Sequence, residues 1–157
     1  NFKMIHLIRD PRGVMNSRIK VEPKKYGKKK LPNSARYLCQ TMAIDMNNTF
    51  KLAKEYPNRV TVLHYEDLAE NPYSTTARLF TFMDLSITLE IYGYIFHITT
   101  AGTSKERAYG VARNNSTSTA NRWKRDLKYD EIKQIDVECK NAYLLIGYLP
   151  VTNSSVL

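Results

Sequence analysis

The sequence predicts an α/β fold in which a partial parallel sheet is flanked by helices. Residues 2–8 are mostly apolar and read as a buried strand, and residues 59–65 (RVTVLHY) alternate and are rich in β-branched side chains, as in a second strand. A helix-start signal follows each of them. A strand–helix–strand–helix order is typical of parallel sheets with right-handed crossovers, and the fold class follows from this alternation.

The first strand ends at a turn that can start a helix. Asp10 is a good N-cap residue, Pro11 suits the first helical position, and apolar side chains recur from there to Ile19. In parallel sheets, ligands bind where strands end and helices begin, and the free amides of a helix N-terminus attract anions. The junction is therefore a candidate anion site.

The candidate anion ligands around this junction are Arg9, Arg12, Gly13 and Ser17. The arginines supply positive charge, the serine supplies a hydroxyl donor, and the glycine leaves room for an anion to approach. A helix that starts near Pro11 carries Ser17 roughly 9 Å along its axis, so the anion would lie between Arg9 and Ser17. The alternative is an ordinary solvated helix start.

The middle of the chain contributes a basic segment and further helices. Residues 21–33 (VEPKKYGKKKLPN) are predicted to form a loop, whose lysines either hold an anionic glycan or are simply solvated. A long helix is predicted over residues 34–56, with Ser34 as its cap, and another helix runs from Asn71 through Phe82.

The last third of the chain is less uniform. Residues 86–100 are apolar and aromatic, and periodicity does not decide between strand and helix. A polar loop is predicted from Gly102 to about Asn121, followed by a helix that Asp130 caps and that closes near Gly147.

Length and composition indicate a single soluble domain with acidic partners. The 157 residues carry a net charge of +9, with 43% hydrophobic and 25% charged residues. Phosphorylated cofactors, anionic glycans and nucleic acid all fit this charge, but no nucleic-acid-binding motif supports the last. The cysteines have no metal-ligand spacing, and Cys39 and Cys139 are either one disulfide or two buried thiols.

The segment RDPRGVMNSR (residues 9–18) resembles the 3′-phosphate-binding element of sulfotransferases that use 3′-phosphoadenosine-5′-phosphosulfate (PAPS). Its Asp-Pro-Arg form resembles the Golgi carbohydrate 6-O-sulfotransferases, which act on galactose, N-acetylgalactosamine and N-acetylglucosamine. In that family the first Arg and the Ser grip the 3′-phosphate, so the resemblance implies this role for Arg9 and Ser17, within a P-loop-like sulfotransferase fold.

Two later segments resemble the same family. YEDLAENP (residues 65–72) is similar to a signature in which the Tyr contacts adenine, which implies that role for Tyr65; the alternative is a core tyrosine. Residues 109–148 resemble the C-terminal end of these enzymes, with the galactose-directed keratan sulfate enzymes nearest. By that resemblance Arg113 also reaches the 3′-phosphate, unless it is a solvated loop arginine, and Trp123 is expected to anchor the core.

The family's loop for the 5′-phosphosulfate and its usual base position are expected upstream, and the chain starts with Asn rather than Met. Residues 1–157 are therefore expected to be the C-terminal part of one sulfotransferase domain, inactive alone. Glu66 and Asp67 are not expected to be an acid–base pair, because adjacent strand residues point to opposite faces. His97 is expected to be packed, and the catalytic residues stay unassigned.

The resemblance to this family implies transfer of sulfate from PAPS, without a metal, to the 6-hydroxyl of a hexose in a glycan. The parent protein would be a single-pass type II membrane protein of the Golgi lumen. The alternative is a non-catalytic module that holds an anionic glycan or a nucleotide. A nucleic-acid-binding domain is suggested by charge alone.

Overall fold

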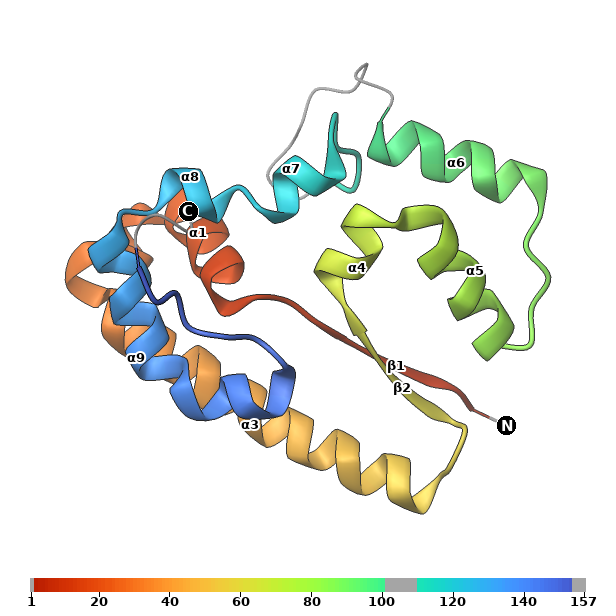
Figure 1. Cartoon of the computed structure of the whole chain (residues 1–157), viewed down its shortest axis with the longest axis horizontal. Helices are drawn as coiled ribbons and strands as arrows, with labels where there is room; N and C mark the ends of the chain where they lie inside the picture. The colour runs from red at the N-terminus through yellow and green to blue at the C-terminus, as the bar shows by residue number, and fades with distance from the viewer. Residues whose placement is uncertain (1, 101–109, 154–157) are drawn as a thin grey trace.

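The computed structural model describes residues 2–100 and 110–153, in which helices predominate (Figure 1). None of the described helices is both long and apolar enough to cross a membrane. In chain order the elements are β1 (Met4–Ile8), α1 (Pro11–Val21), α2 (Pro23–Tyr26), the 3-10 helix η1 (Lys28–Lys30), α3 (Leu31–Glu55), β2 (Val60–His64), α4 (Tyr65–Glu70), α5 (Pro72–Phe82), α6 (Leu89–Thr99), α7 (Ser116–Ala120), α8 (Trp123–Asp126) and α9 (Tyr129–Ile146).

The strands form a two-stranded parallel sheet between two groups of helices. The register runs from Met4 opposite Val60 to Ile8 opposite His64. In Figure 1, α3 and α9 lie side by side on one side of the strands, and α4 and α5 lie on the other. The predicted α/β class is confirmed, and the carboxyl ends of both strands meet at one edge of the sheet.

The first strand is less buried than its apolar sequence predicts. Ile8 is 4% exposed, but Leu7 is 55% exposed and Phe2 is 47% exposed. Successive strand residues point to opposite faces, and the described elements leave the Leu7 side chain open. The prediction of a buried strand is therefore confirmed at Ile8 and wrong at Leu7, and the rest of the strand is half-buried.

The start of α1 agrees with the sequence prediction. The Asp10 side chain accepts a hydrogen bond from the Arg12 backbone N–H at 2.8 Å, and Pro11 is the first helical residue. This cap fixes the direction in which the chain leaves the sheet edge.

The basic segment is helical, so the predicted loop over residues 21–33 is wrong. It forms α2 and η1, and α3 begins at Leu31 rather than after Ser34. Leu31 and Ala35 are both fully buried, so packing extends the long helix toward its N-terminus. Pro32 is tolerated there because backbone N–H groups in the first turn of a helix have no intrahelical acceptor, so no hydrogen bond is lost.

Residues 86–100, left open between strand and helix, form a helix over Leu89–Thr99. In the predicted polar loop, residues 101–109 lie outside the described residues, and α7 occupies Ser116–Ala120. The Asn115 side chain caps α7 by accepting the Ser118 N–H at 2.7 Å. The loop prediction is therefore wrong at its C-terminal end.

The final helix starts one residue earlier than its predicted cap. Lys128 is the N-cap position, and its backbone N–H donates to the Glu131 carboxylate at 2.9 Å, so Asp130 lies in the first turn rather than at the cap. The predicted end is confirmed, because Gly147 adopts a left-handed conformation with φ 78°.

A disulfide between Cys39 and Cys139 joins α3 to α9, with the Cα atoms 5.1 Å apart. Both cysteines are at most 2% exposed. The structure thus resolves the alternative left open by the sequence in favour of the disulfide. Around it lies the hydrophobic core, whose largest fully buried side chains are Met15, Leu31, Ile132, Ile135 and Ile146.

Candidate functional site

Three of the predicted site residues meet where the two strands end. Arg9 follows β1, and its guanidinium carbon lies 4.4 Å from the centre of the Tyr65 ring, which follows β2. Arg9 Nη1 also donates to the Ser17 hydroxyl on α1, at 3.4 Å. The parallel sheet and the helix after β1 therefore bring together residues that are 8 and 56 positions apart.

Arg9 keeps unused hydrogen-bonding capacity. Its Nε atom is buried and has no hydrogen-bond partner among the described residues. A buried N–H that is left unpaired is costly, so this nitrogen is a natural place for an acceptor to bind. We refer to Arg9, Ser17 and Tyr65 as the arginine cluster.

Gly13 is close to this cluster. A Cβ atom at Gly13 would lie 3.1 Å from Arg9 Nε and 3.4 Å from Trp123 Cδ1. A side chain here would push the guanidinium away from α1. The glycine therefore lets Arg9 lie against the first turn of the helix, where free amides and the helix dipole favour an anion.

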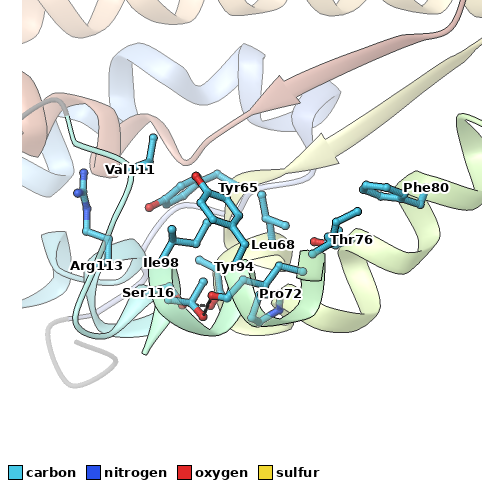
Figure 2. Close-up of a pocket in the computed structure, with 14 residues that line it drawn as sticks. Tyr65, Leu68, Pro72, Thr76, Phe80, Tyr94, Ile98, Val111, Arg113 and Ser116 are labelled. Atoms are coloured by element: carbon cyan, nitrogen blue, oxygen red, sulfur yellow. Dashed lines mark hydrogen bonds between the residues drawn. The ribbon is translucent and has the colours of Figure 1, made fainter. Parts of the chain in front are cut away.

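A cavity of about 440 Å³ lies next to Tyr65. Figure 2 shows Tyr65, Tyr94 and Ile98 gathered in it, with Arg113 at one edge. Its walls are mainly apolar and aromatic, with few polar groups, as expected of a pocket for a flat organic ring. The lining residues are Tyr65, Leu68, Ala69, Pro72, Thr76, Phe80, Ile91, Tyr94, Ile95, Ile98, Thr99, Val111, Arg113 and Ser116.

The backbone carbonyls of Ile98 and Ala112 hold Arg113 in place. Its N–H donates to the Ile98 carbonyl at 2.7 Å, and its Nη1 donates to the Ala112 carbonyl at 2.7 Å. Arg113 is half-buried. Arg113 and Tyr65 thus share one cavity, and Tyr65 links that cavity to Arg9.

Arg12, the other predicted anion ligand, has different partners. It is 5% exposed, pairs with Asp10 at 2.8 Å and Asp136 at 3.5 Å, and stacks on Trp123 at 4.3 Å. Burial acts to lower the pKa of Arg12, but the hydrogen bond and the charge of Asp10 outweigh it and raise that pKa. Its guanidinium joins α1 to α9 and the C-terminal segment. Trp123, 4% exposed, is the predicted core residue.

Sequence reasoning missed a contact that supports this edge of the sheet. Glu66 accepts the Asp10 backbone N–H at 3.2 Å and the Tyr148 hydroxyl at 2.5 Å. Burial, followed by the bond to Glu66, raises the pKa of Tyr148. Glu66 thus ties α4 to the start of α1, whereas Asp67 is exposed. No local sequence pattern indicates a hydrogen bond between residues that are 82 positions apart.

The histidines give no clear catalytic base. His6 Nδ1 lies 2.7 Å from the Thr49 hydroxyl, and His64 Nε2 lies 2.8 Å from the Ile146 carbonyl oxygen. His97 was expected to be packed, but it is exposed, because Ile95 and Thr99 take the buried face of α6. In the described ranges, no group of three or more His, Cys, Asp or Glu side chains could hold a metal ion.

Comparison with known proteins places this geometry in context. The sequence pattern of the family described as "Sulfotransferase domain" matches residues 1–147. Carbohydrate sulfotransferase 2 of Mus musculus is 26% identical over 185 residues, which cover 94% of this chain and 35% of that protein. Carbohydrate sulfotransferase 1 of Danio rerio is 29% identical, with 100% of this chain and 40% of that protein covered.

Carbohydrate sulfotransferase 6 of Homo sapiens is 26% identical, with 96% of this chain and 42% of that protein covered. The chain therefore spans less than half the length of these relatives. No solved structure matches it significantly. Since the family pattern extends over residues 1–147, which include β1, the arginine cluster and α9, this chain belongs to the sulfotransferase domain family.

Proposed function

We propose that the arginine cluster and the adjoining cavity bind the 3′-phosphoadenosine end of PAPS, in a protein that transfers sulfate to a carbohydrate. The observation that carries the proposal is the buried Arg9 Nε, which has no partner among the described residues and lies beside the Ser17 hydroxyl and the Tyr65 ring. A phosphate oxygen would satisfy this nitrogen, and a charge-assisted bond of that kind is among the stronger ones in proteins.

The proposed contacts follow from this placement. Arg9 and Ser17 hold the 3′-phosphate, and Gly13 keeps the guanidinium seated against α1. Tyr65 and the apolar cavity hold the adenine, and Arg113 at the cavity edge adds positive charge near the nucleotide. Arg12 is not proposed to contact the nucleotide, because its guanidinium is already paired with the carboxylates of Asp10 and Asp136.

PAPS supplies the sulfuryl group when it is bound. The residues described here bind and orient the nucleotide, and the cavity walls exclude water from the adenine. A general base for the acceptor hydroxyl and the cradle for the 5′-phosphosulfate are proposed to come from a preceding part of the parent protein. Residues 1–157 then form the C-terminal part of a single domain and have no transfer activity alone.

The proposed acceptor is a glycan. The relatives named above are carbohydrate sulfotransferases, and the proposal takes the 6-hydroxyl of a galactose or N-acetylhexosamine as the accepting group, with a galactose of keratan sulfate as the first choice. The proposed location of the parent is the Golgi lumen, as a single-pass type II membrane protein. No metal and no nucleic acid are part of this proposal.

Calorimetric titration tests the nucleotide site. The protein is titrated with 3′,5′-adenosine diphosphate and with 5′-AMP, and tighter binding of the 3′-phosphorylated ligand is expected. Equal affinities would overturn the assignment of the arginine cluster. A transfer assay from PAPS to a galactose-containing oligosaccharide, with the full-length protein, then separates an enzyme from a non-catalytic binding module, which would bind the nucleotide without transfer.

A further inference from the structure

A second pocket, of about 530 Å³, lies on the basic part of the chain. It is built from the end of α1, the short helices α2 and η1, and the start of α3. We call it the basic groove. Its lining residues are Arg18, Lys25, Tyr26, Lys30, Asn33, Ser34 and Tyr37.

The groove presents positive charge. Arg18, Lys25 and Lys30 line it, and Lys24, Lys28 and Lys29 are exposed beside it. One of these lysines has an acidic partner: the Glu22 carboxylate lies 3.5 Å from Lys25 Nζ. No Asp or Glu is among the lining residues that the structure describes. This excess of cations favours a ligand with several negative charges.

The groove also carries exposed aromatic surface. The Tyr37 side chain is 71% exposed at the first turns of α3, and Tyr26 lies under Arg18, whose guanidinium carbon is 5.6 Å from the ring centre. Asn33 and Ser34 add amide and hydroxyl groups between them. Flat apolar faces beside hydrogen-bonding groups and cations suit a sugar ring that bears sulfate or carboxylate better than a bare inorganic ion.

The groove lies apart from the nucleotide site but on the same helix. Ser17 contacts Arg9, and Arg18, the next residue, lines the groove. Consecutive residues of an α-helix point about 100° apart, so α1 presents one face to each site. A polymer in the groove would therefore not compete with the nucleotide.

We propose that the basic groove binds an anionic segment of a glycan chain, as an extended acceptor contact outside the nucleotide site. The choice of a glycan over other polyanions rests on the proposed function. The groove is lined by seven residues and has a volume of about 530 Å³, so it would hold only part of a polymer.

The test measures binding of immobilised polysaccharides to the protein by surface plasmon resonance. Chondroitin sulfate supplies sulfate and carboxylate groups, hyaluronan supplies carboxylates alone, dextran is neutral, and oligothymidylate represents nucleic acid. We expect binding of chondroitin sulfate, weaker binding of hyaluronan, and none of dextran. The difference between the first two measures how much the sulfate group, with its additional negative charge, contributes to binding.

Two matched double variants distinguish binding at the basic groove from binding that depends only on the net charge of the protein. The double variant Lys25→Gln/Lys30→Gln should weaken chondroitin sulfate binding about tenfold. The control Lys51→Gln/Lys54→Gln removes the same number of charges from exposed positions on α3 that lie roughly 30–36 Å along the helix from Lys30. It should change binding less than about twofold.

Tyr37→Ala changes no charge and should still weaken chondroitin sulfate binding, by about three- to tenfold. Equal losses in the two double variants, or no loss in Tyr37→Ala, would overturn the proposal, and preferential binding of oligothymidylate would assign the groove to nucleic acid instead. Binding of 3′,5′-adenosine diphosphate by the unmodified protein is measured in parallel, so failure of the nucleotide site is seen separately from failure of the groove.

Discussion

The guanidinium of Arg9 stacks on the ring of Tyr65, with 4.4 Å between its central carbon and the ring centre. The two residues follow the two parallel strands, so the sheet register itself sets this contact. The arginine proposed to bind phosphate and the tyrosine proposed to bind the base are therefore in direct contact, and replacing either side chain should alter the position of the other.

Replacement of Arg9 by alanine should weaken 3′,5′-adenosine diphosphate binding by roughly one to two decades, because a charge-assisted contact with phosphate contributes about 1.5–3 kcal/mol. Arg9→Lys should restore only part of the affinity, since a lysine lacks the planar fork of the guanidinium. Calorimetry measures both, and unchanged affinity in Arg9→Ala would remove Arg9 from the site.

Ser17→Ala should have a smaller effect, of about 1 kcal/mol, because a neutral hydroxyl is a weaker donor to phosphate. The loss should appear with 3′,5′-adenosine diphosphate and not with 5′-AMP. If both ligands lose affinity equally, Ser17 does not face the 3′-phosphate.

Arg12→Gln should destabilise the fold by about 3–5 kcal/mol, since it leaves the buried carboxylates of Asp10 and Asp136 without their cation. The matched control is Arg36→Gln, which breaks an ion pair with Glu138 from an arginine side chain that is 52% exposed and should cost less than about 1 kcal/mol. Denaturant unfolding measures both changes, and similar costs would contradict the structural role of Arg12.

Removal of the disulfide with Cys39→Ala/Cys139→Ala should lower the free energy of unfolding by up to about 4–5 kcal/mol, because the bond closes a loop with a sequence separation of 100 residues. A reducing agent should lower the unfolding midpoint of the unmodified protein and leave that of the double variant in place. A midpoint that does not respond to reduction would contradict the bond.

Stability should fall as the pH rises above about 10, where tyrosine ionises in the unfolded chain. Burial raises the pKa of Tyr143 in the folded state, so the folded protein holds this proton while the unfolded chain loses it. The contribution of Tyr143 to the free energy of unfolding is fully present below pH 10 and falls by about 1.4 kcal/mol per pH unit above it. Tyr143→Phe should make this decline shallower, and denaturant unfolding at several alkaline pH values measures the slope.

Much of the fold could be predicted from local signals. The cap at Asp10 and the closing glycine at Gly147 depend on residues within one helical turn, and both predictions are confirmed. The helical start of α3 could not be predicted in the same way, because burial of Leu31 outweighs the turn propensity of the segment before it. Tertiary packing decides such boundaries.

The candidate site, like the fold, could be predicted only in part from local sequence motifs. Arg9 and Ser17 were predicted from one motif, and the structure places them in contact. The burial of Arg12 against Asp136 depends on a partner 124 residues away, which no local pattern reveals. The motif therefore predicted that Arg9 and Ser17 lie close together, and only the fold could show that Arg12 pairs with buried carboxylates.

The disulfide between α3 and α9 also determines how the protein would respond to a protease. It turns the chain from residue 39 to residue 139 into a covalent ring. A single cleavage anywhere inside that ring opens it without releasing a fragment, and the two pieces stay joined through sulfur. Such a nicked molecule runs as one band on a non-reducing gel and as two bands only after thiol treatment, so a non-reducing gel alone would not reveal the cut.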